Sequence, residues 1–412
     1  MNNTNNAIIY DGLRSPFGRH GGILAKVRPD DLMAAVISKL IERNSGLTKN
    51  TAKSTGNNIE DVIIGNTNQA GEDSRNLARH AALLAGLPVT VGGLTVNRLC
   101  GSGMAAVIDA SRAINCNEGQ LYIAGGCESM SRAPWVMAKA ESAFSRDQKI
   151  EDSMIGSRFP NTLITEQFGN PTMPQTADNI AVDLNINRER CDQFAYNSQR
   201  KYAAAKSAGF FTDEILPIST PGDKPRSERI VVDQDEHPRP SVQLEKLTSM
   251  SPLFADGVVT AGNASGINDG AAALLLGNIS TQDSFGCTPK ARIIASAIAG
   301  IEPRVMGLGP VPACQKALKR AGLSLADMDV IEINEAFAVQ VLGCMQLMGL
   351  DDNDSRVNPN GGAIAIGHPL GASGARLILT AQRQLERIQG RYALASMCIG
   401  VGQGIAIIIE RL

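Results

Sequence analysis

The chain is poor in aromatic residues, in histidine, in net charge and in long apolar runs. Aromatic side chains make up 4% of its 412 residues, and 39 basic against 41 acidic residues leave a net charge of −2. So small a charge argues against any broad attraction to nucleic acids or membrane surfaces. No apolar run reaches the roughly 18 residues of a membrane-spanning helix, and the polar segment 1–6 lacks the apolar core of a signal peptide. We therefore expect a cytoplasmic protein.

Cysteine and histidine do not occur in the spacings of a metal site. The chain has eight cysteines and four histidines, and no two cysteines form a Cys-x-x-Cys pair. This argues against a zinc site and against a disulfide scaffold. We predict reduced thiols, no metal and no bound cofactor.

Short apolar segments alternate with helical patterns before residue 131, and the 41 glycines suit closely packed layers. This alternation predicts an α/β protein with a mostly parallel sheet. The length of the chain predicts two or three core units. The expected strands are 7–11, 61–65 and 121–125, and the expected helices are 30–41 and 74–85.

The same order of elements returns in the last third of the chain. Val96-Asn97 and Val357-Asn358 each lead into a glycine-rich turn and a helix. We interpret this as an internal duplication with a ligand cleft between the halves. The N-terminal half is predicted at 1–130, completed by 258–284, and the C-terminal half at 285–412. The second set of expected elements comprises strands 291–296, 329–333, 392–396 and 404–410, and helices 311–321, 336–348 and 372–387.

Residues 131–257 break this regular alternation. The segment is rich in proline and contains one clear helical pattern, between Asn187 and Gly209. The rest is predicted to be loop. Long irregular segments in compact domains usually serve a function, so we interpret 131–257 as an insertion that covers a site.

Cys100 stands where an extended run becomes a helical pattern. Free N–H groups at a helix start favour a thiolate over a thiol. Gly101 and Gly103 remove side chains there, which lets a substrate approach the backbone. The alternative is a buried structural cysteine, because free cysteine is often buried.

Four further residues with reactive or polar groups fall at predicted strand ends or helix starts. His368 precedes a helix, Cys398 and Gly400 follow strand 392–396, and Asn334 follows strand 329–333. A nucleophilic cysteine needs a base, and a second thiol can transfer protons. The Asn334 side chain and the Gly400 N–H can stabilise an oxyanion. Individually, His368 and Cys398 could be structural, and Asn334 could cap the next helix.

The sequence resembles the thiolase family over essentially its whole length. The resemblance implies the thiolase fold, in which two duplicated halves form a five-layered αβαβα core with an inserted loop domain that binds coenzyme A (CoA). It also implies CoA as co-substrate and a homotetramer or dimer. The matching segments are Asn97–Gly103, Gly125–Ser131, Thr260–Gly270, Asn334–Phe337, Gly361–Gly374 and Cys398–Gly400.

The resemblance also implies a role for each of these residues. Cys100 is the nucleophile that carries the acyl group, His368 its base and Cys398 the second acid/base. Asn334 holds a water that, with His368, binds the enolate oxygen, while the N–H groups of Cys100 and Gly400 bind the tetrahedral oxyanion. Ser265 matches a serine near the pantetheine arm, and Phe337 belongs to the same binding region.

Within the family, the chain is most similar to 3-oxoadipyl-CoA thiolases, which cleave their substrate to succinyl-CoA and acetyl-CoA during aromatic degradation. The resembling segments are Gln69–Asn76, Ser142–Asp152, Met173–Asp178 and Asp235–Arg239. Acetoacetyl-CoA thiolases commonly carry His-Met-Gly where this chain has Thr172–Pro174. A buried terminal carboxylate on the substrate needs a cation or several hydrogen-bond donors. Arg158 is the first candidate, before Arg146 and Arg132, and the alternative for each is a solvated or structural arginine.

Other functions remain open from sequence. An acetoacetyl-CoA or general 3-ketoacyl-CoA thiolase would share the same reactive residues. A condensing enzyme acting on a carrier protein would favour Cys-His-His or Cys-His-Asn in place of Cys398. A non-catalytic acyl-CoA-binding protein would be expected to have lost Cys100, His368 or Cys398, yet all three are present.

Overall fold

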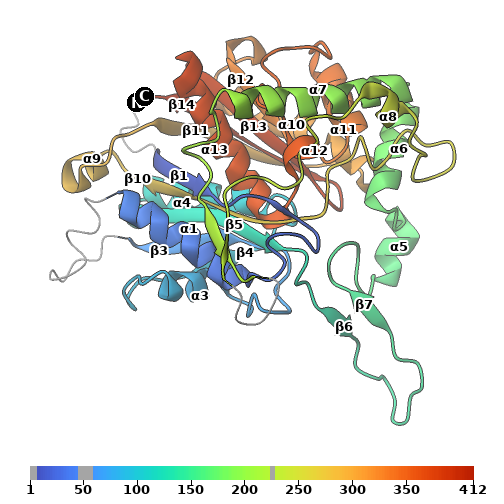
Figure 1. Ribbon diagram of the computed structural model, residues 1–412, viewed down its shortest axis with the longest axis horizontal. Coiled ribbons are helices and arrows are strands. Elements are labelled where there is room, and N and C mark those ends of the chain that lie inside the picture. Colours follow the sequence, from blue (N-terminus) through green and yellow to red (C-terminus); the bar gives the residue numbers. More distant parts are fainter. Residues whose placement is uncertain (1–6, 45–58, 223–227) are drawn as a thin grey trace.

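The computed structural model describes residues 7–44, 59–222 and 228–412 (Figure 1). The prediction about the polar segment 1–6 lies outside these residues. Among the described helices, none combines the length and the apolar character needed to cross a bilayer.

The first half of the chain forms the strands and helices expected from the sequence, several of them longer than predicted. The first strand, for example, continues to Arg14. The elements are β1 (Ile8–Arg14), β2 (Gly18–Arg19), α1 (Pro29–Arg43), β3 (Asp61–Gly65), α3 (Leu77–Leu84), β4 (Leu94–Val96), α4 (Ser102–Asn115), β5 (Leu121–Ser129), β10 (Asn268–Gly277) and α9 (Ser280–Phe285).

The last third repeats this order and adds two short 3₁₀ helices. Its elements are β11 (Ala291–Gly300), η1 (Pro303–Leu308), α10 (Pro310–Ala321), η2 (Leu325–Asp327), β12 (Val330–Ile333), α11 (Ala338–Met348), α12 (Ala363–Ile366), α13 (Leu370–Ile388), β13 (Tyr392–Ile399) and β14 (Gln403–Arg411).

The strand pairing shows the duplication directly. In the first half β1, β10, β5, β3 and β4 lie side by side, paired antiparallel, antiparallel, parallel and parallel. In the second half β11, β14, β13 and β12 follow the same sequence of directions, and Val357 extends it by one parallel bridge to Ile331. Val357 thus stands where β4 stands in the first half.

The prediction of a mostly parallel sheet was wrong. In each half the last strand, β10 or β14, runs antiparallel to both of its neighbours. The two halves then join through a short antiparallel pairing of β1 with β11, at Ile8–Arg292 and Ile9–Ala291. Parallel neighbours need a crossover connection, whereas β13 and β14 are joined by the short turn 400–402 and run antiparallel.

The elements stack in the five layers that the resemblance implied. Helices α1 and α3 cover one outer face, α10 covers the other, and α4 and α13 lie between the two halves of the sheet. One apolar cluster joins this middle layer to both halves. The layers approach so closely that a Cβ atom at Gly126 would lie 1.8 Å from the carbonyl oxygen of Gly371, which explains a need for glycine at the junction.

The segment 131–257 is more regular than predicted. The long helix between Asn187 and Gly209 is confirmed as α7, and the Asn187 side chain caps it by accepting from the N–H of Arg190. The prediction of loop elsewhere was wrong. The other elements are β6 (Trp135–Met137), β7 (Ile150–Asp152), α5 (Thr162–Phe168), α6 (Met173–Leu184), β8 (Ile218–Thr220), β9 (Ile230–Val232) and α8 (Leu244–Thr248).

Helix α6 explains this error. Pro174 lies in the first turn of α6, and Thr172 and Gln175 form a capping box at the N-terminus of the helix. Proline is well tolerated at a helix start because the N–H that it lacks would be unpaired there anyway. A proline that looked like a sign of loop structure therefore marks where a helix begins.

A buried ion cluster attaches part of this segment to β1. Arg14 contacts Glu214 at 2.5 Å and Asp235 at 2.6 Å, and all three side chains are fully buried. The Tyr202 hydroxyl on α7 donates to the same Asp235 at 3.1 Å. Buried charges require such pairing, so the cluster holds Tyr202 of α7, Glu214 and Asp235 against the core.

Candidate active site

Cys100 lies in a tight turn between β4 and α4. The preceding Leu99 has a φ of +47°, a conformation that is strained for a bulky residue. Two hydrogen bonds hold it, from the Leu99 N–H to Asn97 Oδ1 at 2.9 Å and from Ser102 Oγ to the Leu99 carbonyl at 2.6 Å. The turn places Cys100, a partly exposed residue, immediately before the helix.

The surroundings of Cys100 favour the thiol in the resting protein. Burial raises the pKa of Cys100 to about 11, although a hydrogen bond from the Gly400 N–H partly opposes the shift. The prediction that the helix start favours a thiolate was therefore wrong for this state. Desolvation outweighs the helix dipole, which acts only over the first turn.

Cys398 lies close enough to Cys100 to interact with it electrostatically. Burial, followed by the charge of Cys100, raises the pKa of Cys398 well above its usual value. Cys398 was expected after a strand, but β13 continues to Ile399 and pairs Cys398 with Gly404 on β14. The second thiol is therefore held in the sheet, and the Gly400 N–H follows in the turn that joins the two strands.

His368 is buried in the turn before α13. Its Nδ1 lies 2.6 Å from Ser373 Oγ, its Nε2 lies 3.4 Å from Asn334 Nδ2, and its backbone N–H donates to Asn268 Oδ1 at 2.9 Å. Burial, followed by the charge of Arg376, lowers the pKa of His368 to about 3. The imidazole is therefore neutral and able to accept a proton.

Asn334 directly follows β12 and is fully buried. Its N–H donates to the Ser396 carbonyl on β13 at 3.0 Å, while its Oδ1 is buried without a partner among the described residues. Such an oxygen is suited to a bound water. The alternative role as a helix cap is excluded, because the N-cap of α11 is Phe337.

These side chains come from both halves of the chain and meet where α4 and α13 begin. A Cβ atom at Gly103, in the first turn of α4, would lie 2.4 Å from the Gly371 carbonyl at the start of α13. Cys100 and His368 thus precede two adjacent helix starts, beside the ends of β12 and β13 that carry Asn334 and Cys398. The arrangement combines a thiol, a neutral imidazole, a second thiol and oxyanion donors.

Ser265 and Phe337 are also brought together. The Ser265 N–H donates to the Ala336 carbonyl at 2.9 Å, and Ala264 forms a bridge with Phe337. Phe337 is buried and Ser265 is partly exposed. Both lie next to the segment that carries Asn334, and their binding roles remain predictions.

The three candidate arginines differ in their surroundings. Arg132 is paired through two nitrogens with Glu72, so its charge is already neutralised. Arg146 is exposed between β6 and β7. Arg158 is partly buried and donates to the Ser153 carbonyl at 3.1 Å. Of the three, Arg158 alone combines partial burial with a guanidinium that no described carboxylate pairs.

Family models match almost the entire chain. The model described as "Thiolase, N-terminal domain" matches residues 7–280, and "Thiolase, C-terminal domain" matches residues 287–411.

The chain belongs to the thiolase family.

Curated and solved relatives of this thiolase cover its whole length. It is 57% identical to a beta-ketoadipyl-CoA thiolase of Acinetobacter baylyi, over 98% of this chain and 99% of the relative. It is 55% identical to the 3-oxoadipyl-CoA/3-oxo-5,6-dehydrosuberyl-CoA thiolase of Escherichia coli, with the same coverage. The crystal structure of human mitochondrial 3-ketoacyl-CoA thiolase in complex with CoA superimposes with a TM-score of 0.89 at 40% identity, covering 99% of this chain and 98% of that one. The fold and the acyltransferase class of the family are thereby confirmed.

Two buried carboxylates near the site of this thiolase were not identified from sequence. Glu128 accepts from the N–H groups of Thr67 at 3.0 Å, Asn68 at 3.1 Å and Gly371 at 2.9 Å, and burial raises its pKa to about 7. Glu128 thus connects the loop after β3 to the start of α13. A glutamate inside an apolar strand was the available signal for a buried, paired carboxylate.

Glu335 has the same kind of role beside Asn334. It accepts from Ser198 Oγ on α7 at 2.7 Å, from Asn358 Nδ2 at 2.8 Å and from the Ile364 N–H at 3.1 Å. It therefore ties α7 to the loops around Asn334. Its neighbours are distant in sequence, so no local pattern could have revealed these contacts.

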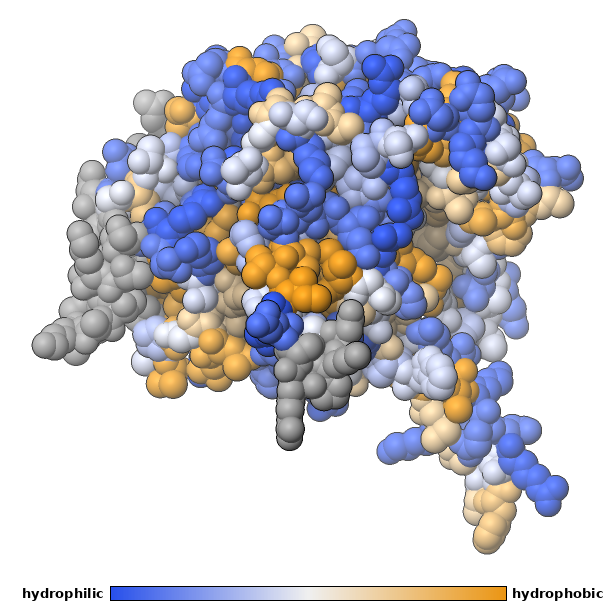
Figure 2. Space-filling view, viewed as in Figure 1, coloured by the Kyte–Doolittle hydropathy of each residue, from blue (hydrophilic) through white to orange (hydrophobic). Residues whose placement is uncertain are grey.

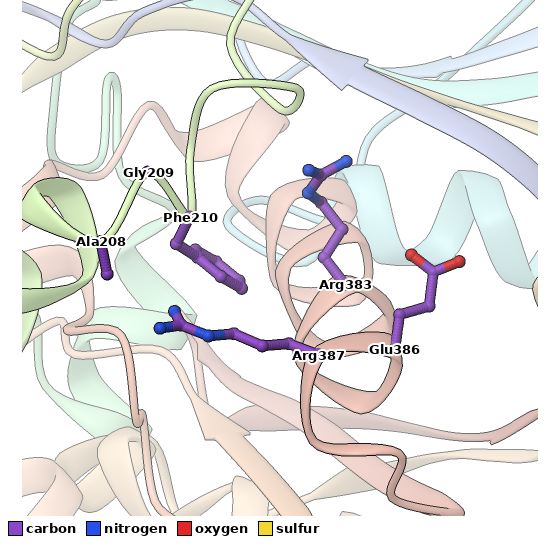
Figure 3. A pocket seen from close by; sticks show the side chains of 6 residues that line it. All are labelled: Ala208, Gly209, Phe210, Arg383, Glu386 and Arg387. Carbon is purple, nitrogen blue, oxygen red and sulfur yellow. The ribbon is translucent and has the colours of Figure 1, made fainter.

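A surface cavity of about 350 Å³ lies elsewhere, between the end of α7 and the C-terminal part of α13 (Figure 3). Arg387 extends along the Phe210 ring, 5.7 Å from its centre. Arg387 is 17 residues beyond the start of α13, which is about 25 Å at 1.5 Å per residue. The cavity is therefore separate from the Cys100 site. Among the described residues, no group of His, Cys, Asp or Glu side chains forms a metal site.

Proposed function

We propose that this thiolase cleaves 3-oxoadipyl-CoA with CoA, giving succinyl-CoA and acetyl-CoA in the degradation of aromatic compounds. The observation that carries the proposal is the approach of Cys100, Gly400 and Cys398 to one another beside the paired His368 and Asn334. The names of the relatives that are 55–57% identical support the choice of substrate.

The reaction proceeds in two steps. Cys100 gives its proton to His368 and attacks the 3-keto carbon, while the N–H groups of Cys100 and Gly400 bind the tetrahedral oxyanion. Cleavage of the bond between C2 and C3 leaves a succinyl group on Cys100 and an acetyl-CoA enolate. The enolate oxygen contacts His368 and a water on Asn334, and Cys398 protonates the enolate carbon. A second CoA thiol, deprotonated by Cys398 or His368, then takes the succinyl group.

The segment 131–257 is proposed as the insertion that holds CoA, together with Ser265 and Phe337, between the halves 1–130 with 258–284 and 285–412. CoA is a co-substrate, and the proposal includes no tightly bound cofactor. The CoA complex of the human relative supports CoA binding. None of the eight cysteines is in a disulfide, which suits a reducing compartment such as the cytoplasm.

We also propose a homo-oligomer, a tetramer or a dimer. The hairpin of β6 and β7 projects from the body of the subunit and carries apolar residues at its surface (Figure 2). Trp135 is 77% exposed, and Met137, Phe144 and Ile150 are exposed as well. Helix α5 has no buried residue. Exposed apolar segments of this kind usually mark protein interfaces.

The test is CoA-dependent thiolysis by the purified protein, with 3-oxoadipyl-CoA and acetoacetyl-CoA assayed side by side. Both substrates are needed, because specificity is a ratio of kcat/KM values. We expect a higher kcat/KM for 3-oxoadipyl-CoA, in line with the names of the relatives. A preference for acetoacetyl-CoA would instead identify a general acetyltransferase. Absence of activity on both substrates, with Cys100 reduced, would contradict the proposal.

Arg158 is proposed to bind the terminal carboxylate of the substrate. Arg158→Met should lower kcat/KM for 3-oxoadipyl-CoA by about 10-fold or more while changing acetoacetyl-CoA turnover little, since a charged hydrogen bond contributes about 1.5–3 kcal/mol. Arg132→Met is the matched control, because Arg132 is occupied by Glu72 and its loss should affect both substrates alike. An equal loss on both substrates in Arg158→Met would exclude Arg158 from specificity.

A further inference from the structure

A chain of hydrogen bonds runs behind His368, on the side away from Asn334. Ser373, in the first turn of α13, places its Oγ 2.6 Å from His368 Nδ1 and 2.8 Å from the Pro369 carbonyl oxygen. All three groups are buried. The serine therefore connects the imidazole ring to the backbone of the same helix start.

The positions of the hydrogens in this chain follow from simple chemistry. A carbonyl oxygen can only accept, so the contact with Pro369 uses the hydroxyl hydrogen of Ser373. The Ser373 oxygen can then only accept from the ring at 2.6 Å, which requires a hydrogen on His368 Nδ1. In a neutral imidazole the other nitrogen, Nε2, then carries the lone pair.

The contacts of the second ring nitrogen agree with this assignment. The Asn334 amide presents its Nδ2, a donor, to His368 Nε2 at 3.4 Å, and its Oδ1 is not used in this contact. The backbone at His368 is held in place, because its backbone N–H donates to Asn268 Oδ1 and the preceding Gly367 has a φ of +108°. A side chain at Gly367 would also collide with Asn268.

We propose that Ser373 is a positioning residue that holds His368 as the Nδ1–H tautomer, so that Nε2 is the atom that takes the proton of Cys100. The inference rests on the proposed thiolase reaction. Free histidine favours the opposite tautomer, so the protein must supply the preference. When Nε2 receives the proton, the ring becomes an imidazolium and Nδ1–H remains bonded to Ser373. The serine thus supports the ring before and after the transfer.

The ring is also kept neutral before the transfer. Burial and the nearby charge of Arg376 lower the pKa of His368, and Arg376 contacts Glu332 of β12 at 3.5 Å. With the ring neutral, its tautomer alone decides whether Nε2, the nitrogen on the side away from Ser373, carries a lone pair.

The first test measures the tautomer itself in the unchanged enzyme. Protein labelled with ¹⁵N-histidine contains four histidines, and the His368 signals are those lost in His368→Asn. We expect a protonated Nδ1 and an unprotonated Nε2 at neutral pH. A protonated Nε2 with a bare Nδ1 would overturn the proposal, whether or not the enzyme cleaves 3-oxoadipyl-CoA.

The second test is the variant Ser373→Ala, which fits the same space and suits a helix. We expect kcat to fall about 10- to 100-fold, as is typical when the partner that orients a functional histidine is removed. KM for CoA should stay unchanged, and the His368 signal should move toward the Nε2–H form. Ser373→Thr keeps the hydroxyl and should restore the Nδ1–H signal.

Ser111→Ala is the matched control, since Ser111 is a buried serine on α4 in the same layer. It should leave both kcat and the His368 signal unchanged. Unchanged kcat and tautomer in Ser373→Ala would overturn the positioning role while leaving thiolysis intact. A wild-type enzyme without thiolysis would instead refute the proposed function, and the tautomer measurement would still decide the role of Ser373.

Discussion

The turns before α4 and α13 occupy equivalent places in the two halves and use a serine in the same way, with different results. Ser102 donates to the Leu99 carbonyl at 2.6 Å, and Ser373 donates to the Pro369 carbonyl at 2.8 Å. Ser102 then accepts from the backbone N–H of Arg98 at 2.8 Å, whereas Ser373 accepts from the ring of His368. The first serine shapes a backbone turn, and the second sets the proton of a side chain.

The two turns also differ in the residue that adopts a positive φ. In the first turn the left-handed residue is Leu99, which costs about 1–3 kcal/mol in strain. In the second it is Gly367, for which a positive φ carries little cost. The nucleophile turn therefore depends on the hydrogen bonds that hold it, while the histidine turn depends on close packing around a glycine.

The sharpest test of this division of roles is removal of the nucleophile. Cys100→Ala should lower thiolysis about 10⁴-fold or more, because the acyl group then has no acceptor and loss of a covalent nucleophile has effects of this size. Cys116→Ala, an exposed cysteine at the end of the same helix, is the control and should retain full activity. Residual activity in Cys100→Ala within about 10-fold of the wild type would transfer the nucleophile role to another group.

The protonation state of the Cys100 thiol can be tested by alkylation. Because the pKa of Cys100 is raised to about 11, its thiolate fraction should increase about 10-fold per pH unit below that value. The rate at which iodoacetamide modifies Cys100 should therefore rise about 100-fold between about pH 7 and 9. Mass spectrometry of the modified protein measures this rate. A plateau below pH 8 would show that the resting enzyme already holds a thiolate and an imidazolium.

The smallest effect is expected for Ser102→Ala. It removes two hydrogen bonds from a strained backbone turn, so the free energy of unfolding should fall by about 1–3 kcal/mol, measured by urea denaturation. Ser373→Ala should lower activity with a smaller loss of stability, because the Pro369 carbonyl also accepts from the N–H groups of Ala372 and Ser373. The proposed difference between the two serines would be contradicted if Ser102→Ala and Ser373→Ala had the same loss of stability and the same loss of activity.

Much of the fold could be predicted from local pattern. Strand β3 was predicted at the observed residues, and α7 was found from its cap at Asn187. The direction of β10 and β14 could not be predicted, because strand direction depends on which neighbours a strand joins. Helix α6 was missed because Pro174 was interpreted as a breaker without regard to its place in the first turn. Helices α5 and α8 were missed as well, and they are short, at 7 and 5 residues.

The candidate site shows the same division. Cys100, His368, Asn334 and Cys398 were selected from their places at strand ends and helix starts, and the structure brings their segments together. The state of Cys100 could not be predicted, because its pKa depends on burial by segments distant in sequence. Glu128 and Glu335 were missed because their partners lie far away along the chain.

The amino-acid sequence was enough to predict the duplicated order of elements, the family, and the chemical kind of each reactive group, because these depend on local periodicity and on the residues themselves. The tertiary structure alone decided which nitrogen of His368 faces Ser373 and that Cys100 rests as a thiol. It also decided that Glu128 connects the two halves and that Glu335 ties α7 to the loops around Asn334. Each of these depends on distances and desolvation set by segments of both halves, and a linear pattern contains neither quantity.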